Sequence, residues 1–198
     1  MWVKVCGLTT PDAVAAAVDA GVDAVGFVFA ESKRRVTAQQ AAELARDVPR
    51  NIVRVAVMLH PSQTELDEVW SQFRPDVLQT DADDLATLRI PADLKVTPVF
   101  RAGRELPTML PSRLLFEGPT SGTGETTDWS AAARLAARTQ LILAGGLKPS
   151  NVADAIAAAK PWGVDVSSGV EARPGVKDPQ KIYDFVRIAR AAGSGAVK

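Results

Sequence analysis

Short runs of apolar, often β-branched residues alternate along the chain with alanine-rich segments whose apolar residues recur at helical spacing. The run Ala24–Phe29 is apolar without alternation, which is typical of a strand covered on both faces. The pattern predicts eight strands, at Trp2–Cys6, Ala24–Phe29, Val53–Met58, Val77–Gln79, Val96–Phe100, Arg113–Glu117, Leu141–Ala144 and Val164–Ser167. It also predicts helices at Pro11–Ala20, Ala38–Asp47, Gln63–Phe73, Ser130–Ala137, Pro149–Ala159 and Pro179–Ala192, with two weaker ones after Thr80 and after Arg104.

Eight strands, each followed by a helix, fit either a closed barrel or a doubly wound open sheet. The glycine-rich sequences follow the last two predicted strands, at Gly145-Gly146 and Ser167-Ser168-Gly169, where barrels place their phosphate-binding loops. We therefore predict an α/β fold, a (β/α)8 TIM barrel, as one compact domain over residues 1–198. The loops must be tight, because such barrels usually need about 250 residues.

Composition narrows the choice of partners and compartment. Lys and Arg together number 23, as do Asp and Glu, and this balance argues against a nucleic-acid or anionic-membrane surface. The single cysteine excludes an intrachain disulfide, and no secretory leader or membrane-length apolar run is visible. A lone histidine excludes a histidine-rich metal site. We expect a cytoplasmic protein, monomeric or homodimeric, whose partner is a small molecule.

Chemistry-bearing residues fall at the predicted carboxyl ends of strands, where barrels gather their active sites. Cys6 ends the first strand, Arg34 and Arg35 follow the second, and Asp128 lies beyond the sixth. Cys6 could be a small buried hydrophobe or a base, and a thiolate base would need help from nearby cations or dipoles. Asp128 could simply cap the next helix, and the two arginines could be surface charges or anion clamps.

Gly145-Gly146 and Ser167-Ser168 predict a phosphate cradle. Glycine lets backbone N–H groups approach phosphate oxygens, and the serine hydroxyls add further donors. The plainer alternative is that these glycines only shape tight turns between strand and helix. Their joint position after the seventh and eighth strands favours the phosphate site.

Several segments, in order along nearly the whole chain, resemble the phosphoribosylanthranilate isomerase family. Lys4–Thr9 resembles that family's opening motif KICG(L/I)T, and Gly163–Glu171, followed by Pro174–Asp178, is the most specific match. The other matching stretches are Ala24–Phe29 with Ser32-Lys33-Arg34, Ser121–Gly124 with Asp128-Trp129, and Ile142–Leu147 with Pro149 and Asn151-Val152.

The resemblance implies an Amadori rearrangement in tryptophan biosynthesis, without a cofactor or metal. Carried over from the family, Asp128 is the general acid that opens the sugar ring, and Cys6 is the general base. Arg34, Gln79 and Asp165 are implied as substrate-binding residues. The implied phosphate-binding residues are Gly145, Gly146, Ser167 and Ser168.

The chain also departs from the family's pattern. Gln79–Asp84 lacks the histidine and glycine of the usual QLHG(D/N)E, the sixth strand ends in Glu117 rather than aspartate, and Glu125 replaces a common lysine. Rival interpretations are another phosphosugar barrel, such as indole-glycerol phosphate synthase or a pentose-phosphate epimerase, and a non-catalytic anion-binding barrel. The synthase needs a lysine and a glutamate on strands, and a metal-dependent epimerase needs histidines.

Overall fold

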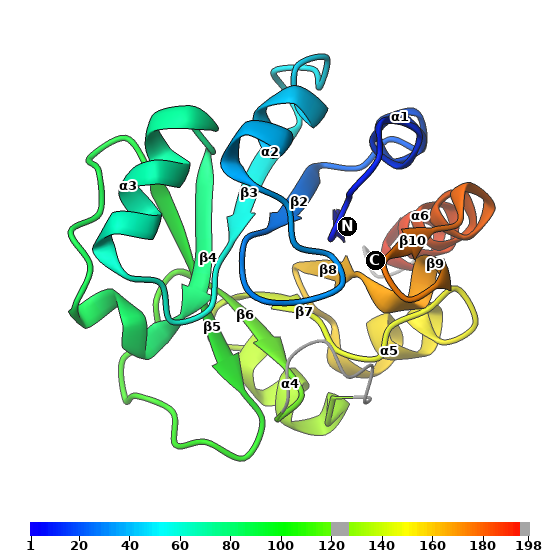
Figure 1. Ribbon diagram of the computed structural model, residues 1–198. Coiled ribbons are helices and arrows are strands. Elements are labelled where there is room, and N and C mark those ends of the chain that lie inside the picture. Colours follow the sequence, from blue (N-terminus) through cyan, green and yellow to red (C-terminus); the bar gives the residue numbers. More distant parts are fainter. Residues whose placement is uncertain (120–126, 195–198) are drawn as a thin grey trace.

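The computed structural model describes residues 1–119 and 127–194, and its centre is a closed barrel of eight parallel strands (Figure 1). Neighbouring strands pair in chain order, and β1 closes the barrel against β8. The strands are β1 (Trp2–Cys6), β2 (Ala24–Val28), β3 (Val53–Val57), β4 (Val77–Asp81), β5 (Lys95–Arg101), β6 (Arg113–Glu117), β7 (Gln140–Leu143) and β8 (Gly163–Val166). The predicted (β/α)8 TIM barrel is confirmed, and the open sheet is excluded.

In the part of the chain that the structure describes, six α-helices surround the strands: α1 (Pro11–Asp19), α2 (Ala38–Leu44), α3 (Gln63–Gln72), α4 (Trp129–Ala136), α5 (Val152–Ala159) and α6 (Pro179–Ser194). Side chains fix where several of them begin. The Thr10 hydroxyl accepts from the Ala13 N–H ahead of α1, and Thr37 and Ser62 form reciprocal capping boxes with Gln40 and Glu65. Each of the six predicted helices is present, with its ends shifted by at most a few residues from the predicted ones.

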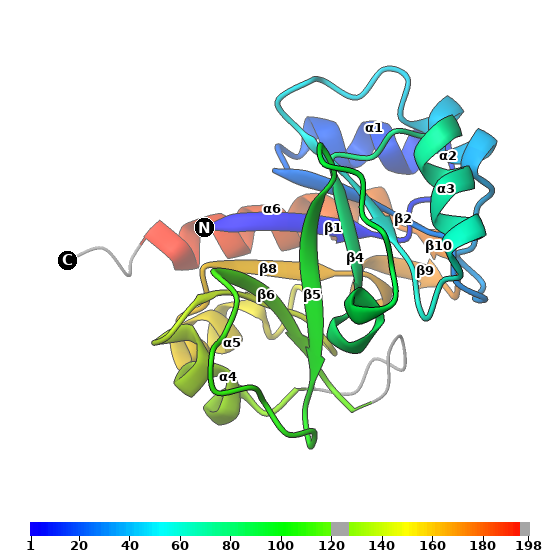
Figure 2. The same ribbon diagram turned by 90° about the vertical axis from the view of Figure 1, so that its left-hand side faces the viewer.

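The barrel is less regular around β4, β5 and β6. The weak helix predicted after Thr80 is a short 3-10 helix, η1 (Ala82–Ala86). The helix predicted after Arg104 is absent from the structure: residues 102–112 form turns, bends and irregular chain, in which Pro107 and Pro111 lack backbone donors. Figure 2, turned toward this side, shows β5 without a helix packed in front of it.

Alternation along each strand separates two layers of side chains. On β1, Val3 and Val5 belong to the main apolar core, which lies between the strands and the helices. Lys4 and Cys6, on the opposite face, are buried inside the barrel. A small second apolar cluster fills part of the interior with Val99, Leu115, Ile142 and Ala144. The barrel interior therefore combines apolar side chains with buried polar ones, and Val99 and Ala144 line the same cavity as Cys6.

The last βα connection carries two elements that the apolar pattern did not predict. After β8 the chain forms a 3-10 turn, η2 (Ser168–Val170), and then a two-stranded antiparallel hairpin, β9 (Glu171–Arg173) with β10 (Val176–Lys177). This hairpin leads directly into α6 (Figure 1). Its strands, of two and three residues, are too short for a periodicity signal.

Candidate active site

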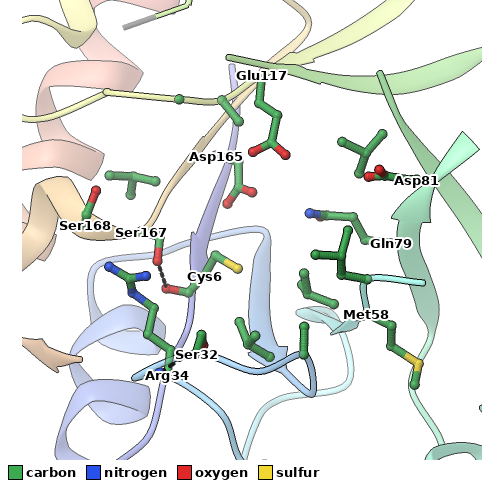
Figure 3. Close-up of a pocket in the computed structure, with 18 of the residues that line it drawn as sticks. Cys6, Ser32, Arg34, Met58, Gln79, Asp81, Glu117, Asp165, Ser167 and Ser168 are labelled. Atoms are coloured by element: carbon green, nitrogen blue, oxygen red, sulfur yellow. Dashed lines mark hydrogen bonds between the residues drawn. The ribbon is translucent and has the colours of Figure 1, made fainter. Parts of the chain in front are cut away.

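One cavity opens at the carboxyl ends of the strands, the face where barrels bear their active sites. Eight of the nine residues predicted for the site line it: Cys6, Arg34, Gln79, Asp165, Gly145, Gly146, Ser167 and Ser168. Asp128 does not. The close-up in Figure 3 shows the labelled side chains of Cys6, Gln79, Asp165 and Glu117 directed into the same space.

Cys6 lies beside a buried ion pair. Lys4 Nζ donates to Asp165 Oδ2 at 2.8 Å, and both side chains are almost fully buried. A Cβ built on Gly26 would lie 3.1 Å from Lys4 Nζ and 3.0 Å from Cys6 Sγ, so both groups adjoin the same point on β2. Lys4 is thus the cation near Cys6 that the sequence left undecided, and Gly26 leaves room for both side chains.

Burial and charge act in opposite directions on these three groups. Burial raises the pKa of the Cys6 thiol, and the nearby ammonium groups of Lys4 and Lys177 oppose that rise. Burial also raises the pKa of Asp165, again opposed by Lys4. Burial lowers the pKa of Lys4, but the charges of Asp165 and Cys6 outweigh it, so the net direction is upward. Lys4 therefore stays protonated and stabilises negative charge beside it.

Asp165 offers an acceptor to the cavity. Its Oδ2 is occupied by Lys4, while Oδ1 is buried and has no hydrogen-bond partner among residues 1–119 and 127–194. An unsatisfied buried carboxylate oxygen is costly, and it is usually explained by a missing ligand or water. Because Asp165 lines the cavity, a bound molecule with an N–H or O–H group could satisfy this atom.

Arg34, rather than Arg35, reaches the cavity. Its Nε and Nη2 donate to the two carboxylate oxygens of Glu171, at 2.6 and 3.0 Å. A Cβ on Gly7 would lie 2.6 Å from Arg34 Cδ and 3.1 Å from Ser167 Oγ, so the arginine passes over Gly7 beside Ser167. Arg35 is exposed, and it is not among the residues that line this cavity. The sequence preference for Arg34 agrees with this placement.

Three charged residues at the ends of adjacent strands form the opposite wall, and the prediction did not assign them a role. Arg101 Nη1 donates to Glu117 Oε1 at 2.5 Å, and Arg101 also donates to both oxygens of Asp81. All three line the cavity. Their positions at the ends of β4, β5 and β6 could have identified them from sequence, by the rule that identified Cys6.

The predicted phosphate loops lie against each other. Gly145 and Gly146 have φ angles of 89° and 66°, a conformation that favours glycine. A Cβ on Gly169 would lie 1.9 Å from Leu147 O, so the loop after β8 touches the loop after β7 directly. The side chain of Asn151 holds the first loop by donating to Gly146 O and accepting from Lys148 N. The two loops therefore form one rigid corner of the cavity.

The two predicted serines differ within this corner. Ser167 Oγ donates to Cys6 O at 3.1 Å and lies 3.3 Å from Lys177 Nζ, so its hydroxyl is already engaged. Ser168 lines the cavity at the start of η2. Ser168 is thus the better placed of the two hydroxyls to donate to a ligand.

Asp128 is the predicted site residue that lies outside the cavity. Its Oδ1 accepts from the N–H groups of Ser130 and Ala131 and from the Ser130 hydroxyl, at 2.8, 3.1 and 2.7 Å. The carboxylate is exposed, caps the N-terminus of α4, and has its pKa lowered by these hydrogen bonds. This geometry favours the helix-cap interpretation of Asp128 over the predicted catalytic role. Ser121–Gly124 and Glu125, which precede it, lie outside the described residues.

The composition and arrangement of residues 1–119 and 127–194 limit other kinds of site. These residues contain no cluster of three or more His, Cys, Asp or Glu side chains arranged to hold a metal ion. In the same residues, none of the helices has the length and apolarity to cross a membrane.

Comparisons with known proteins point to one family. The family described as N-(5'phosphoribosyl)anthranilate (PRA) isomerase matches residues 3–188. The N-(5'-phosphoribosyl)anthranilate isomerase of Listeria monocytogenes serotype 4b (strain F2365) is 40% identical over 200 residues, covering 96% of this chain and 98% of that protein. The crystal structure of TrpF from Jonesia denitrificans superposes with a TM-score of 0.81 and 40% identity, covering 97% and 98% of the two chains.

A further solved structure contains a ligand. It is a phosphoribosyl anthranilate isomerase in complex with reduced 1-(o-carboxyphenylamino)-1-deoxyribulose 5-phosphate, with a TM-score of 0.76, 28% identity, and coverage of 96% and 99%. The match in sequence and fold extends over nearly the full length of both chains in each comparison. The chain belongs to the N-(5'-phosphoribosyl)anthranilate isomerase family.

Proposed function

We propose that this isomerase converts N-(5'-phosphoribosyl)anthranilate to 1-(2-carboxyphenylamino)-1-deoxyribulose 5-phosphate, with Cys6 as general base and Glu117 as general acid. The observation that carries the assignment is that a thiol and a carboxyl group, from β1 and β6, line one cavity beside the two glycine-rich loops (Figure 3). The complexed relative, whose ligand is a phosphorylated, carboxylated aminosugar, supports this substrate class.

The phosphate end of the substrate fits the corner formed by the loops after β7 and β8. Gly145 and Gly146 leave their backbone N–H groups accessible, and Ser168 adds a hydroxyl. Anchoring the phosphate here places the sugar over Cys6, because Ser167 is hydrogen-bonded to the carbonyl of Cys6 itself. Binding energy from this remote group then positions the reacting carbon.

The first chemical step is ring opening. Protonated Glu117 gives its proton to the furanose ring oxygen, the bond between that oxygen and C1 breaks, and the nitrogen lone pair forms an iminium at C1. Arg101, which bonds both Glu117 and Asp81, fixes the direction of this carboxyl group. Asp81 balances the arginine's charge, so that Glu117 does not face it alone. We assign the acid role to Glu117 because Asp128 lies outside the cavity.

The second step is proton abstraction. The Cys6 thiolate removes the proton from C2, the electron pair neutralises the iminium, and an enolamine forms. Tautomerisation then transfers a proton to C1 and leaves a ketone at C2, so the overall reaction conserves all atoms. The Lys4 ammonium stabilises the thiolate and opposes the effect of burial on its pKa. Each such proton transfer is worth roughly a hundred- to ten-thousand-fold in rate.

Three further residues hold the aminosugar and the anthranilate ring. The unsatisfied Asp165 Oδ1 accepts from the substrate N–H, Gln79 contacts a sugar hydroxyl, and Arg34 faces the anthranilate carboxylate. The chemistry as written uses side chains alone, so we propose that the enzyme works without metal or cofactor. We further propose that it acts in the cytoplasm as a monomer or homodimer and binds no nucleic acid.

The test is to add purified protein to N-(5'-phosphoribosyl)anthranilate, follow the loss of its fluorescence, and identify the product by mass and by its keto group. A Cys6→Ser/Glu117→Gln double variant corrects for spontaneous decomposition of the substrate. We expect saturable conversion by the wild type that far exceeds the double variant and is insensitive to chelators. Equal rates would contradict the function, and a chelator-sensitive rate would contradict its metal-free form.

A further inference from the structure

The β9–β10 hairpin lies against the loop that carries Arg34. Gly175, at its tip, has a φ of 84°, and a Cβ there would lie 2.6 Å from Lys33 O. Thr9 Oγ1 donates to Gly175 O at 3.2 Å, which fixes the same tip from the loop after β1. The hairpin is therefore packed between the β1 and β2 loops, next to the residue whose side chain reaches the cavity.

Glu171, the first residue of β9, holds the Arg34 guanidinium in a fixed direction. The two Arg34–Glu171 hydrogen bonds are bidentate, and the two side chains are only 14% and 5% exposed. Bidentate pairing fixes both the position and the plane of a guanidinium, which a single hydrogen bond does not. It engages Nε and Nη2, so Nη1 remains to face a ligand at the cavity rim.

Lys177, on β10, fixes Glu171 in turn. Its Nζ lies 3.1 Å from Glu171 Oε1 and 2.9 Å from Ser167 O, and its side chain is fully buried. The chain of contacts therefore runs from Arg34 through Glu171 and Lys177 to Ser167, which bonds the carbonyl of Cys6. Burying the charges of Lys177 and Glu171 costs desolvation free energy even though the two groups are paired. A functional role for the cluster explains why this cost is tolerated.

The charges of this cluster also explain why Lys177 is needed. A paired Arg34 and Glu171 would be nearly neutral, and a neutral pair attracts an anion only weakly. Lys177 adds a second positive charge, so the cluster of one carboxylate and two cations keeps a net charge of +1 beside the cavity. Glu171 can thus orient Arg34 without cancelling the attraction for a carboxylate.

We propose that Glu171 and Lys177 are positioning residues that act through Arg34: Glu171 aims its guanidinium at the substrate's anionic group, and Lys177 both locks Glu171 and preserves the positive charge. This inference rests on the proposed function in one respect, namely that Arg34 contacts the substrate. The alternative is that the cluster only stabilises the hairpin.

A double-mutant cycle separates these alternatives. Glu171→Gln breaks the bidentate pair, and Arg34→Met removes the guanidinium. The readouts are kcat/KM and the affinity for reduced 1-(o-carboxyphenylamino)-1-deoxyribulose 5-phosphate. We expect Glu171→Gln to weaken both by about ten- to a hundred-fold in the wild-type background and to have almost no effect when Arg34 is already Met. Equal losses in both backgrounds would overturn the proposal.

A second measurement does not depend on turnover. The Arg34 Nε–H should be protected from solvent exchange by NMR in the wild type and in Arg173→Gln, which removes an exposed cation from the same hairpin. We expect this protection to be lost in Glu171→Gln and reduced at least tenfold in Lys177→Met. Undiminished protection in both variants would overturn the positioning role even in an active enzyme. If the wild type does not isomerise the substrate, the proposed function fails, and the exchange data still decide whether the cluster orients Arg34.

Discussion

The Nζ of Lys4 lies 2.8 Å from the Oδ2 of Asp165, and this buried ion pair supports the catalytic end of the barrel interior. Both residues point inward from adjacent strands, β1 and β8, at paired positions in the register. One partner adjoins the Cys6 thiol through Gly26, and the other lines the cavity. In the proposed mechanism, the pair therefore links the state of the base to the binding of substrate.

Lys4→Met should raise the pKa of the Cys6 thiol. The Lys4 charge opposes the upward shift that burial causes, so removing it leaves only Lys177 to oppose that shift. Because the base must be a thiolate, the rising limb of kcat/KM should move to higher pH. Cys6 is the chain's single cysteine, so thiolate absorbance titrates this group alone.

Lys4→Arg keeps the charge and is the matched control. Breaking a buried pair by removing one partner costs about 3–5 kcal/mol of stability, so the unfolding of each variant is measured first. If Lys4→Met does not fold, Lys4→Arg alone should still titrate close to the wild type. A thiol pKa that is unchanged or lower in folded Lys4→Met would contradict the coupling.

Cys6→Ser should lower kcat by roughly a hundred- to ten-thousand-fold, because a hydroxyl is a far weaker acid than a thiol and cannot supply the base. Affinity for inorganic phosphate should be preserved, since the loops after β7 and β8 are untouched. Single-turnover kinetics measure the loss of catalytic rate, and calorimetry measures the affinity for inorganic phosphate. Substantial turnover by Cys6→Ser would remove Cys6 from the mechanism.

Gly169→Ala should weaken phosphate binding. The added Cβ would lie 1.9 Å from Leu147 O, so one of the two phosphate loops must move. Losing one hydrogen bond to a charged group costs about 1.5–3 kcal/mol, which corresponds to roughly tenfold or more in Kd. Calorimetry with inorganic phosphate measures the Kd of each variant. Gly103→Ala is the control for backbone strain: its φ is 83°, its Cβ meets nothing within 4 Å, and it does not line the cavity. Equal affinity in the two variants would rule out the loop contact as the cause.

The sequence predicted the barrel and most of the site for one physical reason. Parallel strands buried on both faces have a strong apolar signal, and the barrel rule then brings Cys6, Gly145 and Ser167 to a single face. The sequence left the role of Asp128 open, because an aspartate before a helix fits both a cap and the family's motif. Only the direction of its side chain, toward the Ser130 and Ala131 N–H groups, distinguishes them.

Other features depend on contacts that no local pattern encodes. The position of Lys4 relative to Cys6 depends on the space left by Gly26, which lies on another strand. The pairing of Arg101 with Asp81 and Glu117 joins three strands, and the Glu171–Arg34 pair spans 137 positions along the chain. Such long-range ion pairs could be found only after the strand register was known.

Asp76→Asn should lower stability in a pH-dependent way. Burial raises the pKa of Asp76, but the hydrogen bonds and charge of Arg54 outweigh it, so the folded-state pKa is below the ordinary 3.8. A lowered carboxyl pKa contributes stability above the unfolded-state value, and this contribution is lost as pH falls through the folded-state value. The free energies of unfolding of the two proteins should differ at neutral pH and converge below about pH 3.8.

Urea unfolding at several pH values provides the comparison, with exposed Asp93→Asn as the control. A difference between Asp76→Asn and the wild type that is constant across the acid range would show that the Arg54 pair does not shift the titration of Asp76.

The central proposal is that Glu117, and not Asp128, is the acid. The kcat values of Glu117→Gln and Asp128→Asn, measured side by side on N-(5'-phosphoribosyl)anthranilate, test it most directly. Glu117→Gln should lose roughly a hundred- to ten-thousand-fold in kcat, since an amide cannot protonate the ring oxygen. Asp128→Asn, which keeps a side-chain oxygen for the helix cap, should stay close to the wild type. The reverse order, with Asp128→Asn inactive and Glu117→Gln active, would contradict the account.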